Sequence, residues 1–296
     1  MLEIKNLTVG YKEKEVLRGI HLSVDSGEIL GICGESGTGK TTLGLALMGV
    51  LRERNSNVRV SGELLLNNRD LLTMPTEDVR KMQWKNIGMI FQNVATALNP
   101  VMSVIDQVAE PLITRCGVSR KTALATAAEK LHRMNLPDRA ADSFPHELSL
   151  GERQRALAAM SIVCDPGLLI MDEPFSALDM ASRSRLIPVY QRLLRKRTGI
   201  FISHDIDMLA RLCTRIAILY GGMIVEQGAA EKIISEQRHP YTRGLFRSFP
   251  SMQRTRDLQG IRGRVRFTAS GCPFHPRCTQ RSEEHTSELQ SLLIIS

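Results

Sequence analysis

The sequence predicts an α/β protein that has a parallel-sheet core, an antiparallel β-subdomain, a helical subdomain and a short C-terminal extension. Residues 2–30 and 58–67 alternate apolar and polar side chains, which is typical of strands with one buried face. From about residue 93 to 165 the apolar residues recur at helical spacing instead. Strand-like and helix-like segments then alternate from Pro166 to Ile224, which favours a parallel sheet covered by helices.

A glycine-rich loop follows the apolar run from Ile29 to Cys33 and opens a helix-like segment from Thr41 to Leu51. The loop reads GESGTGKT and fits the pattern G-x-x-x-x-G-K-S/T of a phosphate-binding loop. In such a loop backbone N–H groups turn toward the phosphates, the lysine reaches the β- and γ-phosphates, and the last hydroxyl can ligate Mg²⁺. A glycine-rich turn with a chance lysine is the alternative interpretation. We expect ATP to contact Gly34, Glu35, Ser36, Gly37, Thr38, Gly39, Lys40, Thr41 and Thr42, with Thr41 also on Mg²⁺.

Two adjacent carboxylates end an apolar run that begins at Leu168. The run predicts a buried parallel strand, and ligands of open α/β sheets bind at the carboxyl end of such strands. We therefore expect Asp172 to hold Mg²⁺ through a water and Glu173 to take a proton from the attacking water. The other interpretation is a helix N-cap with two solvated acids, which Pro174 would also support.

Two further strings complete the set: LSLGE at 148–152, between the glycine-rich loop and the run that begins at Leu168, and SHD at 203–205, after that run. The order of all four motifs resembles the nucleotide-binding subunit of an ABC transporter. The resemblance spans roughly residues 2–280. It implies one P-loop ABC ATPase cassette over residues 1–236, whose helical subdomain at about 93–165 would face a membrane subunit. Residues 237–280 would form an extension of the oligopeptide and nickel importer type.

The LSLGE string resembles the family's signature loop, which presents Ser and Gly to the γ-phosphate bound by a partner subunit. Here these residues would be Ser149 and Gly151. The family usually has LSGGQ or LSGGM, so Leu150 and Glu152 depart from the pattern. We expect the bulky, β-preferring residue at 150 and the added negative charge at 152 to weaken the contact in the partner's site, by about 1 kcal/mol for each effect.

The resemblance also implies roles for four other residues. Tyr11 is similar to the aromatic residue on which adenine stacks, although a core or surface tyrosine is the alternative. Gln92 is similar to the glutamine that contacts Mg²⁺ and the attacking water. Asp179, in the string SALD, would link the two nucleotide sites of a dimer. His204 is similar to the switch histidine that contacts the γ-phosphate, whereas a lone histidine is normally a satisfied surface residue.

Three strings indicate the cargo. HPYTRGL at 239–245 and GCPFHPRC at 271–278 resemble strings of oligopeptide, dipeptide and nickel importers. FQNVATALNP is close to a string of peptide-type importers, from which Asn93 and Val94 depart. Because some of these importers have four cysteines near the second string, Cys272 and Cys278 could begin an iron–sulfur site, with free or structural thiols as the alternative.

Composition limits the setting in which the protein works. The 296 residues are 43% hydrophobic, yet no stretch approaches a membrane span and Met1 to Val9 lacks the layout of a signal peptide. Six scattered cysteines make a disulfide framework unexpected. The formal charge of +8 is compatible with nucleic acid or an anionic membrane surface, and we favour the membrane because no nucleic-acid-reading motif is visible.

The last residues look non-native. RSEEHTSELQS resembles a sequencing-library adapter translated in frame, so we expect residues 281–296 to be an adapter-derived tail after a truncated extension. A natural polar, disordered tail is the alternative.

The sequence thus predicts an ATP-binding and ATP-hydrolysing subunit that energises import of peptides or nickel through an ABC transporter. The expected partners are two transmembrane permease subunits, a second ABC ATPase subunit in a heterodimer and, indirectly, an extracytoplasmic substrate-binding protein. The expected location is peripheral, on the cytoplasmic face of the inner (plasma) membrane, without nucleic acid. Two alternatives stay open: a cassette with impaired turnover that serves as the regulatory half of a heterodimer, and a soluble ABC ATPase outside transport.

Overall fold

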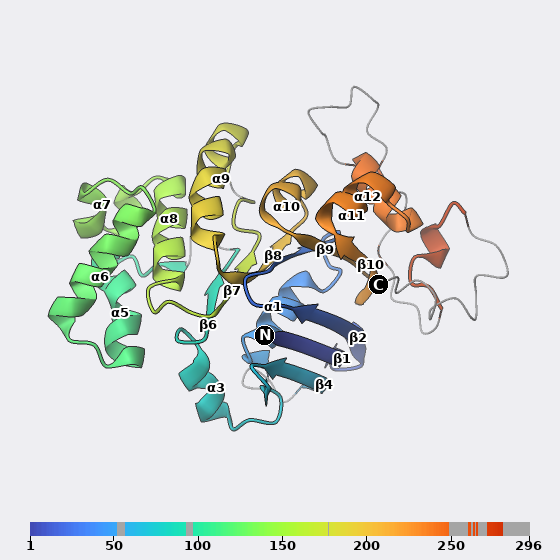
Figure 1. The fold of residues 1–296 in the computed structure, drawn as a ribbon, viewed down its shortest axis with the longest axis horizontal. Coiled ribbons are helices and arrows are strands. Elements are labelled where there is room, and N and C mark those ends of the chain that lie inside the picture. The colour runs from blue at the N-terminus through green and yellow to red at the C-terminus, as the bar shows by residue number, and fades with distance from the viewer. Residues whose placement is uncertain are drawn as a thin grey trace. The chain divides into compact units, whose positions relative to one another are not determined.

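The computed structural model describes residues 1–51, 57–92, 97–176, 178–248, 260, 261, 263, 265 and 271–280 (Figure 1). Asn93, Val94, Ala177 of the SALD string and the expected adapter-derived tail lie outside these residues. The chain divides into two compact units, unit 1 (Met1–Met74, Phe201–Ser296) and unit 2 (Pro75–Ile200). This division by compactness differs from the sequence-based boundary after residue 236, which stays a prediction.

Unit 1 contains the expected antiparallel sheet, in the order β2-β1-β4-β5. Figure 1 shows its first three strands side by side. In the first strand Leu2, Leu7 and Val9 are buried, and the alternation changes phase once. Asn6 has a φ of 50°, and the register with the neighbouring strand shifts between Ile4 and Leu7. This irregularity keeps the apolar residues on the buried face. The strands are β1 (Leu2–Tyr11), β2 (Lys14–Val24), β4 (Val58–Leu66) and β5 (Arg69–Asp70).

A second set of strands in unit 1 precedes and supports the glycine-rich loop. β3 (Ile29–Cys33) is buried throughout and runs parallel to β9 (Arg215–Tyr220), which pairs antiparallel with β10 (Met223–Ala229). β8 (Thr198–Ser203) leads the chain from unit 2 into unit 1. The helices of unit 1 among the described residues are α1 (Lys40–Leu47), α10 (Ile206–Leu212), α11 (Ala230–Glu236), α12 (Pro240–Ser248) and the 3₁₀ turn η2 (His275–Arg277).

Unit 2 pairs β6 (Ile87–Ile90) with β7 (Leu168–Asp172) in parallel and adds a group of helices. The described helices are α3 (Thr76–Met82), α5 (Val104–Cys116), α6 (Arg120–Arg133), α7 (Arg139–Asp142), η1 (Pro145–Glu147), α8 (Leu150–Ser161) and α9 (Met180–Leu194). Three of them, α5, α6 and α8, pack together (Figure 1). Each of these three begins at a serine N-cap.

These elements confirm the predicted fold class, since parallel strand pairs, an antiparallel sheet and a helical group are all present. Among the described residues, no helix combines the length and the apolar character needed to cross a bilayer.

Candidate functional site

Two glycines of the loop between β3 and α1, Gly34 and Gly39, lie too close to neighbouring atoms to leave room for a side chain. A Cβ atom on Gly34 would lie 2.3 Å from the backbone oxygen of Leu219, and one on Gly39 would lie 2.7 Å from Leu17 Cδ2. Gly39 and Gly37 also have φ values of 108° and 79°, in the left-handed region that favours glycine. The loop conformation therefore depends both on local glycines and on the neighbouring strands.

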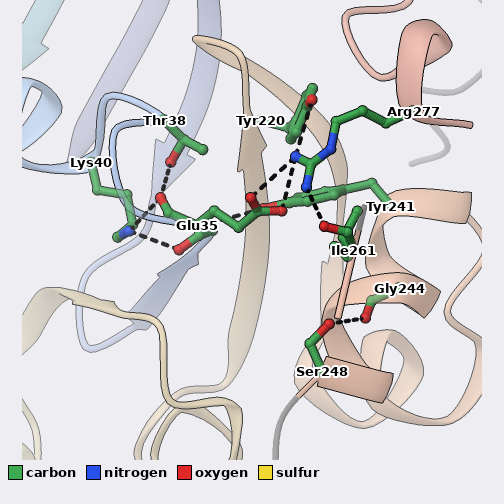
Figure 2. A network of polar contacts seen from close by, with 10 residues as sticks. Glu35, Thr38, Lys40, Tyr220, Tyr241, Gly244, Ser248, Ile261 and Arg277 are labelled. Atoms are coloured by element: carbon green, nitrogen blue, oxygen red, sulfur yellow. Dashed lines mark hydrogen bonds and ion pairs between the residues drawn. The ribbon is translucent and has the colours of Figure 1, made fainter. Parts of the chain in front are cut away.

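Lys40 lies over this loop and holds two of its carbonyl groups. Its Nζ donates to the backbone oxygens of Gly34 and Glu35 at 2.7 and 2.9 Å, and the Thr38 hydroxyl donates to the latter oxygen at 2.8 Å (Figure 2). The N-cap of α1, Gly39, has no side-chain cap, and Thr41 in the first turn is exposed. Backbone N–H groups, an ammonium and a hydroxyl are the groups that suit a polyphosphate with Mg²⁺.

The other two candidates of unit 1 lie at strand ends. Tyr11 is the last residue of β1, opposite Lys14 and Val58, and is half-buried. His204 follows β8 and is also half-buried. The next residue, Asp205, caps α10 by accepting from the N–H of Met208 at 3.2 Å, so His204 lies on a strand-to-helix turn.

In unit 2, Asp172 is the last residue of β7 and Glu173 follows it in an uncommon backbone conformation. Both side chains are buried, and Glu173 has a φ of 49°. Left-handed backbone at a residue other than glycine is uncommon and is found at turns and at functional sites. The residues after Pro174 form a turn, and α9 begins only at Met180. The alternative of a helix N-cap with solvated acids is therefore wrong.

Gln92 and Asp179 lie at other places in unit 2. Gln92 is exposed and lies two residues after β6, which ends at Ile90. Asp179 is the N-cap of α9 and accepts from both the N–H and the hydroxyl of Ser182, at 2.9 and 2.8 Å. Each of these residues remains a candidate by its resemblance to the family.

The signature loop forms the start of α8, with a reciprocal cap that the sequence-based expectation did not include. The Ser149 N–H donates to Glu152 Oε2 at 2.9 Å, and the Glu152 N–H donates to Ser149 Oγ at 3.3 Å. Arg139 donates to Glu152 Oε1 at 2.6 Å. Burial raises the pKa of Glu152, but the hydrogen bonds from Ser149 and the charges of Arg139 and Arg155 lower it below its ordinary value.

This arrangement bears on two parts of the expectation for the signature loop. The carboxylate of Glu152 is paired within its own chain, with its helix N-terminus and with Arg139, while the weaker contact in a partner's site stays a prediction. Leu150 is the first residue of an α-helix, which corrects the β-preferring backbone expected there, but its side chain remains larger than the glycine usual in the family.

Gln154 connects α8, the helix that begins at the signature loop, to the turn that follows Glu173. No pattern in the sequence had indicated a role for Gln154. Its buried Nε2 donates to the Pro174 backbone oxygen at 2.7 Å. In the variant Gln154→Met that oxygen would lose its donor, and a buried unsatisfied acceptor costs about 1–3 kcal/mol. Because Pro174 adjoins Glu173, we expect ATP turnover to fall about fivefold at an unchanged dissociation constant for ATP. Steady-state ATPase rates and ATP binding test this, and turnover that falls equally in the control Gln227→Met would contradict it.

The HPYT string lies in unit 1, where Glu226 and His239 fix its start. The N–H groups of Arg238 and His239 donate to the carboxylate of Glu226 at 2.9 and 3.0 Å, and His239 Nδ1 accepts from the Tyr241 N–H at 3.1 Å. Burial, with a smaller contribution from Arg243, lowers the pKa of His239 to about 4. The neutral imidazole is therefore the form that the fold requires.

This shift makes stability depend on pH in a defined window. Between the lowered pKa of His239, about 4, and the ordinary value near 6.5, the unfolded chain binds more protons, so stability falls as pH drops through the window. In His239→Asn, an amide oxygen can replace Nδ1 as acceptor without titrating. Urea unfolding measures the free energy of unfolding at about pH 7.5 and about pH 5. Between these pH values the wild type should lose about 2 kcal/mol more of this free energy than the variant. Equal losses would show that His239 is not the responsible group.

The extension also contacts the phosphate-binding loop, which the sequence analysis missed. The N–H of Glu35 donates to Tyr241 Oη at 2.9 Å, and Arg277 Nη1 lies 3.1 and 3.2 Å from the two carboxylate oxygens of Glu35 (Figure 2). Tyr241 belongs to the string HPYTRGL and Arg277 to the string GCPFHPRC. The two strings indicate the type of extension, but they do not indicate which residues of the cassette it contacts.

The structure does not support the suggested iron–sulfur site. Cys272 Sγ lies 3.8 Å from His239 Nε2, and both Cys272 and Cys278 are free thiols. Within the part of the chain that the structure describes, no three His, Cys, Asp or Glu residues are grouped so that they could hold a metal ion.

Comparisons with known proteins agree with the geometry. The sequence model "ABC transporter" matches residues 17–176, and the model "Oligopeptide/dipeptide transporter, C-terminal region" matches residues 225–284. The chain is 36% identical to the oligopeptide transport ATP-binding protein OppD of Bacillus subtilis, over 86% of this chain and 73% of the relative. It is 37% identical to the dipeptide transport ATP-binding protein DppD of Haemophilus influenzae, over 96% of this chain and 89% of the relative.

Solved structures show the same fold. The dimeric bacterial ABC transporter cassette MJ0796 superposes with a TM-score of 0.69 at 26% identity, over 78% of this chain and 99% of that chain. CbiO1 of Clostridium perfringens, part of the ABC transporter complex cbiONQ, gives a TM-score of 0.69 at 26% identity, over 80% of this chain and 91% of that chain. This protein therefore belongs to the ABC transporter family and has the fold of its ATPase cassettes.

Proposed function

We propose that this chain is the ATP-hydrolysing subunit that energises import of peptides through an ABC transporter. The observation that supports this most is the presence, in one chain, of the ABC cassette and of the C-terminal region of oligopeptide and dipeptide transporters. The relatives named for oligopeptide and dipeptide transport match both parts of the chain.

The residues of the phosphate-binding loop bind ATP in this proposal. Backbone N–H groups of residues 34–42 surround the phosphates, apart from that of Glu35, which donates to Tyr241 Oη. Lys40 lies where its ammonium can move from two loop carbonyls to the β- and γ-phosphates. Thr41 contributes its exposed hydroxyl to Mg²⁺. When bound, the cation offsets the negative charge that builds up on the phosphates. Tyr11 stacks on the adenine ring.

Hydrolysis follows from the residues of the other motifs, by their resemblance to the family. Glu173 takes a proton from the attacking water, and its buried carboxylate on a left-handed turn is held apart from bulk solvent. Asp172 and Gln92 are the remaining ligands for Mg²⁺, and His204 positions the water against the γ-phosphate. Each of these roles can be removed by a single substitution.

Turnover requires a second cassette. Ser149 and Gly151 would face the nucleotide held by that cassette, and Asp179 would link the two sites. Because Leu150 departs from the family pattern, the two sites of a pair differ, and we propose a heterodimer. The further partners are two transmembrane permeases and, through them, a substrate-binding protein, with the cassette peripheral on the cytoplasmic face of the inner membrane.

Transport by the assembled complex tests the function. Proteoliposomes would contain this protein, its second cassette and the two permeases, with the substrate-binding protein and labelled peptides added on the opposite side. We expect peptide uptake that requires ATP and is absent when ATP is replaced by a non-hydrolysable analogue. Nickel, the other cargo expected from the sequence, serves as the comparison. ATP-dependent uptake of Ni²⁺ without any uptake of peptide would overturn the proposed cargo, and ATP hydrolysis without either would overturn the transport role tested here.

A further inference from the structure

Glu35, the second residue of the phosphate-binding loop, is held through both of its backbone polar groups. Its N–H donates to Tyr241 Oη at 2.9 Å, while its carbonyl oxygen accepts from Thr38 Oγ1 at 2.8 Å and from Lys40 Nζ at 2.9 Å (Figure 2). The carbonyl contacts come from within the loop. The N–H contact comes from α12, 206 residues further along the chain.

The side chain of Glu35 is held by the extension as well. Arg277 Nη1 contacts both carboxylate oxygens, at 3.1 and 3.2 Å, and also donates to Tyr220 Oη at 3.3 Å. Arg277 Nη2 donates to the Ile261 backbone oxygen at 3.0 Å. Only 4% of the Arg277 side chain is exposed, against 28% for Glu35. A guanidinium this deeply buried is costly without an anionic partner, so the pair is a strong determinant of where Glu35 lies.

Aromatic packing keeps the two contacting groups in place. The ring of Tyr241 is fully buried and lies 4.5 Å from that of Tyr220 and 5.3 Å from that of Phe274, between ring centres. Arg277 lies over Tyr220 and Phe274, at 5.7 and 6.0 Å from their ring centres. A hydroxyl and a guanidinium that are immobilised before the nucleotide arrives can define a loop geometry without further loss of conformational freedom.

We propose that Tyr241 and Arg277 position the phosphate-binding loop for ATP through Glu35, so that the C-terminal extension raises the affinity of the cassette for nucleotide. Glu35 adjoins Gly34, and the carbonyls of these two residues hold Lys40. A shift of Glu35 therefore moves the lysine and the backbone N–H groups that face the phosphates. The inference rests on the proposed role of residues 34–42 in ATP binding and adds two residues that lie outside that loop.

Substitution of each partner in the full-length protein tests the inference. The variants are Tyr241→Phe, Arg277→Gln and Glu35→Gln, measured by equilibrium binding of a fluorescent ATP analogue and by KM and kcat for ATP with the second cassette present. We expect each to raise the dissociation constant and KM about three- to tenfold, with kcat within about twofold of the wild type. Arg277→Lys, which keeps the charge, should recover part of the affinity. The double variant Glu35→Gln with Arg277→Gln should have a dissociation constant no higher than that of the single variant with the lower affinity, because the two residues act through one contact.

Two matched controls separate positioning from general loss of structure. Tyr190→Phe changes another buried tyrosine, whose hydroxyl has no hydrogen-bond partner among the described residues of unit 2. Arg243→Gln changes an arginine of the extension that contacts Gln280 and the Arg238 backbone oxygen. Both are expected to bind the ATP analogue like the wild type.

Several results would overturn the inference. Unchanged nucleotide affinity in Tyr241→Phe and Arg277→Gln would do so, as would an equal loss in Arg243→Gln or additive losses in the double variant. If Arg277→Gln fails to fold, Glu35→Gln tests the same contact from the loop side. A further variant, Lys40→Ala, tests the proposed function separately from the role of the extension. If Lys40→Ala binds ATP like the wild type, the proposed role of the loop in ATP binding is wrong.

Discussion

Replacing Glu173 by glutamine is expected to lower the rate of ATP hydrolysis by about 100-fold or more, because loss of a general base removes about 10²- to 10⁴-fold of rate. The amide has nearly the shape of the carboxylate but cannot accept the proton of the attacking water. Since the backbone turn at Glu173 is unaffected, ATP binding should persist. Steady-state ATPase assays with the second cassette present, together with equilibrium ATP binding, measure both effects.

The matched control for this variant is Glu129→Gln. Glu129 lies on the exposed surface of α6, where it pairs with Arg133. We expect full activity in that protein. If Glu173→Gln retains activity within about tenfold of the wild type, the proton is accepted by another group, since a lost general base costs more than that.

Replacing Gly34 by alanine should weaken ATP binding by about tenfold or more, because overpacking of a well-fitted site typically costs about 1–3 kcal/mol. The added methyl group would lie 2.3 Å from the backbone oxygen of Leu219, so either the loop or β9 must move. Movement of Gly34 also displaces one of the two carbonyls that hold Lys40. Equilibrium binding of a fluorescent ATP analogue measures the loss.

Gly228→Ala is the control for this substitution. A Cβ atom at Gly228 would meet its nearest neighbour, Ile233 Cδ1, at 3.6 Å, which is an ordinary van der Waals contact. We expect unchanged nucleotide affinity there. Normal affinity in Gly34→Ala would show that the loop tolerates a shift against β9 and that its observed conformation is not required for binding.

In the signature loop the local sequence pattern indicates only some of the groups that surround a charge. The spacing of Ser149 and Glu152 is that of a capping box, in which serine and glutamate satisfy each other's backbone N–H groups at a helix start. The sequence contained this signal, yet the charge of Glu152 was expected to face a partner's phosphate. Arg139 also pairs with the carboxylate of Glu152, although it lies 13 residues away. No local sequence pattern predicts this contact.

The sequence by itself determined the elements that depend on neighbouring residues. Side-chain alternation predicted the antiparallel strands, the apolar run before Asp172 predicted a buried parallel strand, and glycine spacing predicted the loop between β3 and α1. These predictions succeed because burial periodicity and backbone freedom are properties of residues a few positions apart.

Only the tertiary structure decided which distant groups surround those elements. Gly34 has to be glycine because β9 passes against it, and Glu35 is held by Tyr241 and Arg277, which lie 206 and 242 residues away along the chain. The same is true of the lowered pKa of His239, which results mainly from burial of its ring. Contacts of this kind arise when the chain packs, because they depend on which surfaces meet, and the spacing of residues along the sequence does not contain that information.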